Sequence, residues 1–200
     1  MPKSFPTYRT LPLLASAVLA AFVSVTAVAD KQPSAQTPDD VALAEQFLDA
    51  FYRWDAQALT KLMRPSEQAA NALYYQAWAE AAHYQIVTRR PCAHEGSVIE
   101  CRVTVTDDFG QAMGYQATDT FRLHVAHGLI DGVTFAGDDP PIFEEVFAWL
   151  SQERPHLFAG PPDAGACHLM FAGGTTPAAC ARAIAIGARD FMRLRNQANP

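Results

Sequence analysis

The spacing of apolar residues changes from helical to alternating near Tyr84, and this change constrains the fold more than any other feature of the sequence. Before it, residues 38–83 carry apolar side chains three and four positions apart, as amphipathic helices do. After it, residues 84–136 alternate between apolar and polar side chains, as strands with one buried face do. The sequence therefore predicts an α+β domain in which helices cover one face of a curved antiparallel sheet.

Capping signals divide the helical part into three segments. Thr37-Pro38 is expected to begin the first helix, and acidic residues in its first turn favour the positive end of the helix dipole. Asp55 is expected to cap a short second helix that ends near Pro65. Ser66 is expected to begin a third helix, which runs to about His83.

Four strands are predicted, over residues 84–91, 97–107, 117–127 and 129–136, with a loop over residues 108–116 that contains two glycines. The connections between these strands are short, which favours antiparallel pairing. One face of the sheet is apolar and needs a cover, and the three preceding helices supply it.

Two more helices are expected after the sheet. Asp139 precedes two prolines and is predicted to cap a helix over residues 141–152, and a final helix is predicted over residues 176–193. We interpret residues 37–155 as one domain and residues 156–200 as a C-terminal extension of it.

The first 29 residues have the composition of a cleavable secretory signal peptide. Lys3 and Arg9 precede an apolar run that ends on Ala27-Val28-Ala29, the order of basic, apolar and small residues that signal peptidase recognises. An uncleaved membrane anchor is the alternative, because the run approaches the ~20 residues of a spanning helix. Polar residues within the run favour cleavage. We therefore expect a secreted or periplasmic protein, free of the membrane after cleavage, in which residues 30–36 form a polar lead.

The charge balance opposes a nucleic-acid partner. The whole chain has a net charge of −6, and loss of residues 1–29, which hold two cations and no acids, changes it to −8. No basic cluster opposes this excess of negative charge.

Four cysteines follow the predicted cleavage site, an even number that favours disulfides in an exported chain. They allow three pairings, and the sequence alone does not choose among them. A hairpin turn at Gly96-Ser97 would place Cys92 opposite Cys101 at a non-hydrogen-bonded position, where antiparallel strands lie closest. This geometry favours a Cys92–Cys101 bond and leaves Cys167 with Cys180. A zinc site is the disfavoured alternative, since the chain has no Cys-x-x-Cys, and we expect neither a metal nor a cofactor.

Parts of the helical region and of the sheet resemble a known superfamily. Residues 43–51 (LAEQFLDAF), 54–59 (WDAQAL) and 119–130 (DTFRLHVAHGLI) are similar to the SnoaL-like branch of the NTF2-like superfamily. The resemblance covers about residues 38–150 and implies a cone in which the sheet wraps round the helices to form an apolar pocket. Members range from ketosteroid isomerases and dehydratases to binding modules, so the resemblance implies a pocket and no particular reaction.

Asp119 is the candidate catalytic residue. The alternation places its carboxylate on the same apolar face as Phe121, where burial would raise its pKa toward the range useful for general acid or base catalysis. The alternative, which we favour, is a structural carboxylate that lies at the pocket rim or accepts hydrogen bonds from a neighbouring tyrosine or tryptophan. Aromatic residues are the candidates for ligand binding, although such residues at helical spacing more often form core: Tyr52, Trp54, Tyr74, Trp78 and Phe121.

Three hypotheses on function follow. We favour an exported domain that binds a small apolar molecule in its pocket, because a pocket is implied and no catalytic constellation is evident. The first alternative is a cofactor-free acid–base enzyme, an isomerase or dehydratase, that uses Asp119. The second is an interaction module that forms a homodimer through the polar outer face of the sheet, which carries Arg102, Thr104, Arg122 and His124.

Overall fold

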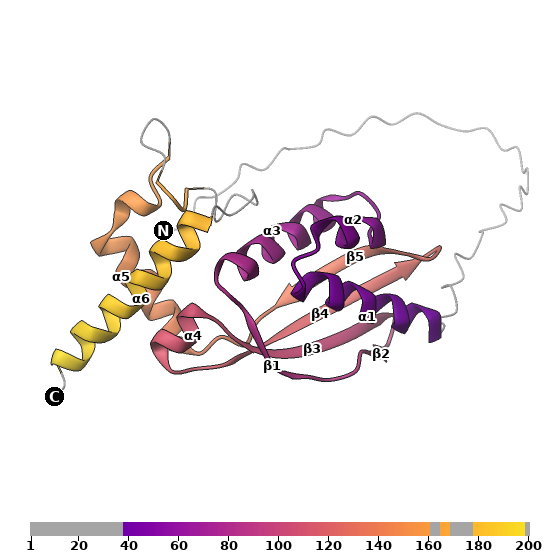
Figure 1. Ribbon diagram of the computed structural model, residues 1–200, viewed down its shortest axis with the longest axis horizontal. Coiled ribbons are helices and arrows are strands. Elements are labelled where there is room, and N and C mark those ends of the chain that lie inside the picture. Colours follow the sequence, from indigo (N-terminus) through magenta and orange to yellow (C-terminus); the bar gives the residue numbers. More distant parts are fainter. Residues whose placement is uncertain (1–37, 161–164, 169–177, 199–200) are drawn as a thin grey trace, which may run out of the picture. The chain divides into compact units, whose positions relative to one another are not determined.

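The computed structural model of the protein describes residues 38–160, 165–168 and 178–198 (Figure 1). The predicted signal peptide, the polar lead and the start of the predicted final helix lie outside the described residues. Within the described part of the chain, no helix is long and apolar enough to cross a membrane.

The elements follow the predicted α+β order, with three helices before the sheet. In chain order they are α1 (Pro38–Tyr52), α2 (Ala56–Leu62), α3 (Glu67–Ala81), β1 (Gln85–Arg89), β2 (Ala93–Glu95), β3 (Val98–Thr106), α4 (Asp108–Met113), β4 (Ala117–Ala126), β5 (Leu129–Ala136), α5 (Pro141–Glu153), the short 3-10 helix η1 (Pro155–Leu157) and α6 (Ala178–Ala198).

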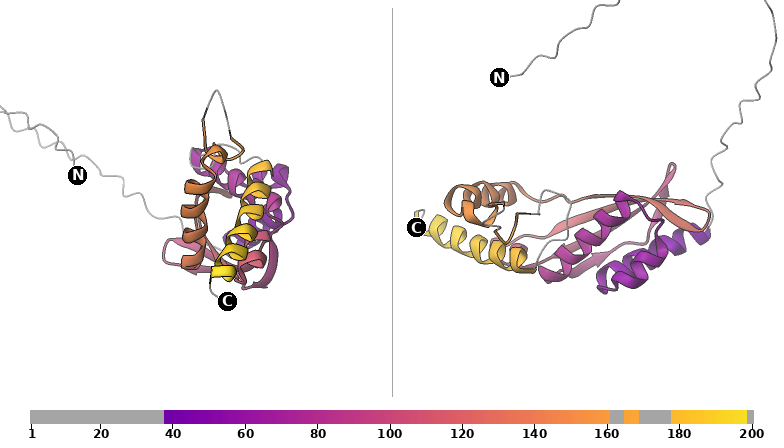
Figure 2. Two further views of the ribbon diagram at one scale, coloured as in Figure 1. Left: turned by 90° about the vertical axis from the view of Figure 1, so that its left-hand side faces the viewer. Right: turned by 90° about the horizontal axis from the view of Figure 1, so that it is seen from above.

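The sheet is antiparallel throughout, in the order β1-β3-β4-β5, and β2 also pairs with β3. Helices α1, α2 and α3 lie together along one face of the sheet (Figures 1 and 2). The inward residues of β3 are buried as the alternation predicts, and they pack against the apolar side chains of α1. The outer face is polar, and Glu100 there accepts from Arg102 at 2.7 Å and pairs with Arg122 at 2.8 Å.

Of the three predicted helix caps that lie within the described residues, two are confirmed. Asp55 Oδ1 accepts from the amide of Ala58 at 2.8 Å at the start of α2, and Ser66 begins α3 in the same way. The predicted cap at Asp139 is wrong: α5 begins at Pro141 as predicted, but its N-cap is Pro140, which makes no side-chain capping bond.

Residues 108–116 contain helix α4, where the sequence predicts only a loop. Asp107 caps this helix by accepting from the amide of Gly110 at 2.7 Å, and Gly114 ends it with φ +75°. Phe109 and Met113 are buried against α3 and α6. Gly110 therefore allows the backbone of α4 to lie close to Tyr115, and Gly114 forms the C-cap of the helix.

Gly110→Ala is expected to lower the free energy of unfolding by about 1–3 kcal/mol. A Cβ at this position would lie 2.7 Å from the carbonyl oxygen of Tyr115 and 2.8 Å from Thr106 Oγ1. Urea denaturation measures the change, with Gln111→Ala, an exposed position of the same helix, as the control. Alanine favours a helix over glycine by about 1 kcal/mol when there is space for its side chain. A variant as stable as the wild type, or more stable, would therefore contradict the close contact of Gly110 with Tyr115 and Thr106.

Both predicted disulfides are present. Cys92 and Cys101 are bonded with Cα atoms 4.3 Å apart, next to a hairpin turn in which Gly96 has φ +61°. The Cys167–Cys180 bond joins residues 165–168 to the first turn of α6. Side chains of α6 share a buried cluster with α3, α4 and α5.

Candidate functional site

Asp119 and Tyr52 form a hydrogen-bonded pair inside the domain. Asp119 points inward from β4, opposite Val103 of β3, and is only 3% exposed. Tyr52 is the last residue of α1, and its hydroxyl donates to Asp119 Oδ2 at 2.6 Å. The chain therefore brings together a buried carboxyl and a phenol that are 67 residues apart.

Burial is the main influence on the titration of this pair. It raises the pKa of Asp119 to about 7, against the lowering effect of the Tyr52 hydrogen bond, and the charges of Asp139 and Asp107 raise it further. Burial and the Asp119 charge raise the pKa of the Tyr52 hydroxyl well above its usual range. At neutral pH the Asp119 carboxyl is therefore divided between its protonated and ionised forms, whereas Tyr52 keeps its proton.

The carboxylates near Asp119 form an acidic region. Asp107 is buried as the cap of α4, and burial raises its pKa to about 6 although the amides of Gly110 and Phe109 oppose the shift. Burial and the adjacent Asp138 raise the pKa of Asp139. The negative charges of Asp139, Asp107 and Asp138 thus add to the effect of burial on the pKa of Asp119.

A pocket of about 250 Å³ lies beside this region, bounded by α1, α3, β5 and α5. Seven of the nine described residues that line it are aromatic, and we call it the aromatic pocket. Asp139 is its charged lining residue and is itself exposed, so it lies where the pocket meets solvent. The lining consists of Phe51, Tyr74, Tyr75, Trp78, Ala79, Tyr84, Phe135, Asp139 and Phe143.

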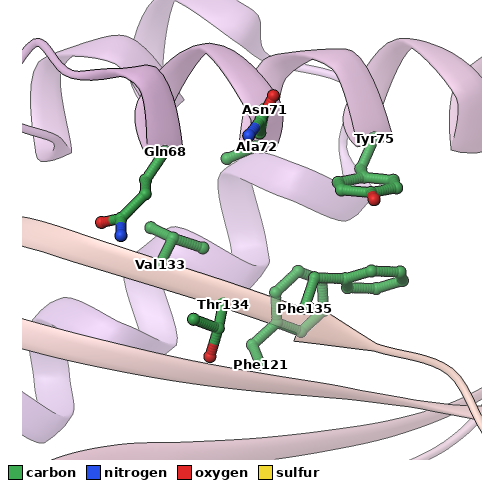
Figure 3. A pocket seen from close by; sticks show the side chains of 8 residues that line it. All are labelled: Gln68, Asn71, Ala72, Tyr75, Phe121, Val133, Thr134 and Phe135. Carbon is green, nitrogen blue, oxygen red and sulfur yellow. The ribbon is translucent and has the colours of Figure 1, made fainter. Parts of the chain in front are cut away.

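A second cavity, of about 290 Å³, adjoins the aromatic pocket between α3 and the strands. Figure 3 shows Gln68 and Tyr75 extending from α3 toward Val133 and Phe135 of β5. Tyr75 and Phe135 line both hollows, and their ring centroids are 4.7 Å apart, so this pair separates the two.

The structure distributes the predicted ligand-binding residues over three places. Tyr74 and Trp78 line the aromatic pocket, and Phe121 lines the second cavity. Tyr52 bonds to Asp119, and Trp54 lies in the turn after α1 with its ring 6.5 Å from that of Tyr52. Asp119, Tyr52 and Trp54 are not lining residues of either hollow.

Four lining residues of the aromatic pocket were not among the ligand-binding residues predicted from the sequence and come from later segments of the chain: Tyr84, Phe135, Asp139 and Phe143. Phe135 was signalled by the alternation of β5, since it shares the inward face of that strand with Val133. Tyr84 and Asp139 lie at junctions between elements, where periodicity gives no signal, and Phe143 lies in the first turn of α5. Within the described residues, no group of three or more histidine, cysteine or acidic side chains is placed to hold a metal ion.

Comparisons with known proteins give similarity at the level of structure alone. No protein-family model matches the chain, and no curated protein matches it. Similar solved structures include a de novo designed β-sheet protein, with 16% identity, a TM-score of 0.42 and coverage of 52% of this chain and 92% of that one. An NTF2-like protein of unknown function from Cytophaga hutchinsonii has 15% identity, a TM-score of 0.38 and coverage of 55% and 98%. AclR, a putative hydroxylase from Streptomyces galilaeus, has 16% identity, a TM-score of 0.38 and coverage of 62% and 99%.

The order of elements agrees with the resemblance seen in the sequence. Three helices followed by an antiparallel sheet, with the helices on one face, is the arrangement that the NTF2-like resemblance implies, and the described residues have it. The similarities of structure carry no information on activity, which has to be argued from the site.

Proposed function

We propose that the protein binds a small, largely apolar molecule in the aromatic pocket. The lining carries this proposal, because seven aromatic side chains line about 250 Å³ and few polar groups stand among the described lining residues to orient a ligand. Trp78 and Tyr74 are themselves buried in α3, so this wall of the pocket is held by core packing. The two disulfides and the predicted signal peptide support a place of action outside the cytoplasm, in the periplasm or the medium.

Ala79→Leu is expected to weaken binding of an apolar probe by about tenfold or more. Ala79 is 1% exposed and lines the pocket, so a larger side chain there takes volume from the ligand. Isothermal titration with naphthylmethanol, a neutral bicyclic probe, measures the affinity. Ala70→Leu, at an exposed position of α3, is the matched control. Undiminished binding by a folded Ala79→Leu variant would place the probe elsewhere and refute the proposed site.

An acid–base enzyme is the second candidate, and the Asp119–Tyr52 pair supports it. A carboxyl with a pKa of about 7 can take and return a proton at neutral pH. Asp119 is not a lining residue of the pocket, so binding remains our first proposal. A pocket ligand with an acidic C–H next to a carbonyl group is the appropriate probe, incubated in deuterium oxide. If the wild type incorporates deuterium into this ligand and Asp119→Asn does not, the result favours the enzyme. Equal incorporation with both proteins would contradict the enzyme and leave binding as the proposed function.

A further inference from the structure

The charges at the aromatic pocket all have the same sign. Asp139 lines the pocket, and within the described part of the chain no lysine, arginine or histidine lines it. Asp138 precedes Asp139 in the chain, and the charges of Asp107 and Asp119 act together with that of Asp139 on the hydroxyl of Tyr84, another lining residue. Arg89 is the cation whose charge acts on Tyr52, and it is held by ion pairs with residues of α1.

The aromatic rings contribute negative potential of their own. The face of an aromatic ring carries partial negative charge, which attracts a cation lying within about 6 Å of the ring centre. The rings of Tyr74 and Tyr75 are 5.5 Å apart at 78°, and Tyr75 is tilted by 31° to Phe135, so neighbouring walls meet at an angle. Rings that surround a space from several directions suit an ammonium group.

The three charge classes of ligand differ in how they fit this environment. An anion would add negative charge to a region in which Asp119 already holds its proton up to about pH 7. A neutral apolar molecule would fill the volume and leave the repulsion among the carboxylates unchanged. A cation would relieve that repulsion, and its apolar body would still contact the rings.

We propose that the ligand of the aromatic pocket is a small organic amine in its ammonium form, with the charged group beside Asp139 and the apolar body among the rings of Tyr75, Trp78 and Phe135. This inference rests on the proposed binding function and adds the charge class of the ligand to it. Asp139 lies where the pocket meets solvent, so the ammonium group keeps part of its hydration while the apolar body is buried.

Three probes of the same size and shape test the inference on the full chain at pH 7.5 by isothermal titration. They are naphthylmethylammonium, naphthylmethanol and naphthoate, which differ in charge at one position. We expect the ammonium probe to bind at least about tenfold more tightly than the alcohol, and naphthoate to bind more weakly than both. Asp139→Asn is expected to reduce the affinity for the ammonium probe to that for the alcohol and to leave the alcohol unchanged. Asp131→Asn, which alters an aspartate paired with His124 away from the pocket, is the matched control and should change neither affinity.

The outcomes separate this inference from the proposed function. Equal binding of the ammonium probe and the alcohol, or tighter binding of naphthoate, would overturn the inference and leave a neutral or anionic ligand in the same pocket. Failure of all three probes to bind to folded protein would overturn the proposed function as well. If Asp139→Asn does not fold, the order of the three affinities in the wild type decides the matter.

Discussion

Phe121→Ala is expected to lower the free energy of unfolding by about 3–5 kcal/mol, the range for removing a buried phenylalanine ring. Phe121 is 1% exposed on β4, and its ring packs against four others. The centroid distances are 5.7 Å to Phe47, 5.0 Å to Phe51, 6.3 Å to Tyr52 and 5.0 Å to Phe135. Removal of the ring therefore opens a cavity between α1 and the sheet.

Equilibrium urea denaturation at constant pH measures this loss. Phe121→Leu keeps most of the volume and is expected to cost about 1–2 kcal/mol. Phe143→Ala is the matched control for the denaturation measurement alone, because Phe143 is only half-buried on α5 and itself lines the aromatic pocket. Phe51 and Phe135 line the aromatic pocket, so Phe121→Ala is also expected to weaken probe binding. A loss below about 1 kcal/mol would contradict the central position that we assign to this ring.

The sheet is predictable from the sequence because its signals are local. In β3 the buried residues Ile99, Cys101, Val103 and Val105 alternate with polar ones, and this pattern follows directly from a strand with one covered face. The same parity assigns Asp119 to the inner face of β4, where its side chain lies. Helix α4 is harder to predict, because Gly110 and Gly114 are also typical of loops, and the burial of Phe109 and Met113 that accompanies the caps at Asp107 and Gly114 depends on distant segments.

Tyr74 and Trp78 were predicted to line a pocket, but the rest of the lining of the aromatic pocket was not predictable, because it depends on contacts between distant segments. Tyr74 and Tyr75 are consecutive on α3 and both line it, although consecutive residues of a helix point about 100° apart. Phe143 comes from α5 and joins lining residues of α1, α3 and β5 that are far from it in the sequence. Asp139 precedes two prolines, so the capping rule predicted it to be an N-cap. In the structure it makes no cap and lines the pocket.

Tyr52 and Trp54 show how the end of a helix changes the role of a side chain. Helix α1 ends at Tyr52, and Trp54 has φ +62°, so it leaves the helical face on which its spacing placed it. Tyr52 stays on that face, but its hydroxyl is committed to Asp119. Periodicity assumes that the helix continues, so it predicts neither the departure of Trp54 from the helical face nor the hydrogen bond of Tyr52 to Asp119.

The wild type is expected to lose about 2–3 kcal/mol of its free energy of unfolding between pH 5 and pH 8 through Asp119. The pKa of Asp119 is about 7 in the folded state and about 3.9 in the unfolded chain. Between these values the folded state binds more protons, so stability is fully present below about pH 4 and is lost as the pH rises through 7. Asp107, with a pKa of about 6, adds a smaller loss of the same sign.

Asp119→Asn is expected to remove the Asp119 part of this slope and to raise the free energy of unfolding at pH 8 by about 2–4 kcal/mol, since it abolishes a buried charge. Asparagine still offers an oxygen to the Tyr52 hydroxyl. Urea denaturation at pH 5, 6, 7 and 8 measures both effects, with Asp39→Asn at the exposed start of α1 as the control. A pH profile parallel to that of the wild type would mean that burial does not shift Asp119. A carboxyl that destabilises the fold at neutral pH has no structural advantage over its amide, so confirmation would strengthen the acid–base candidate for this pair.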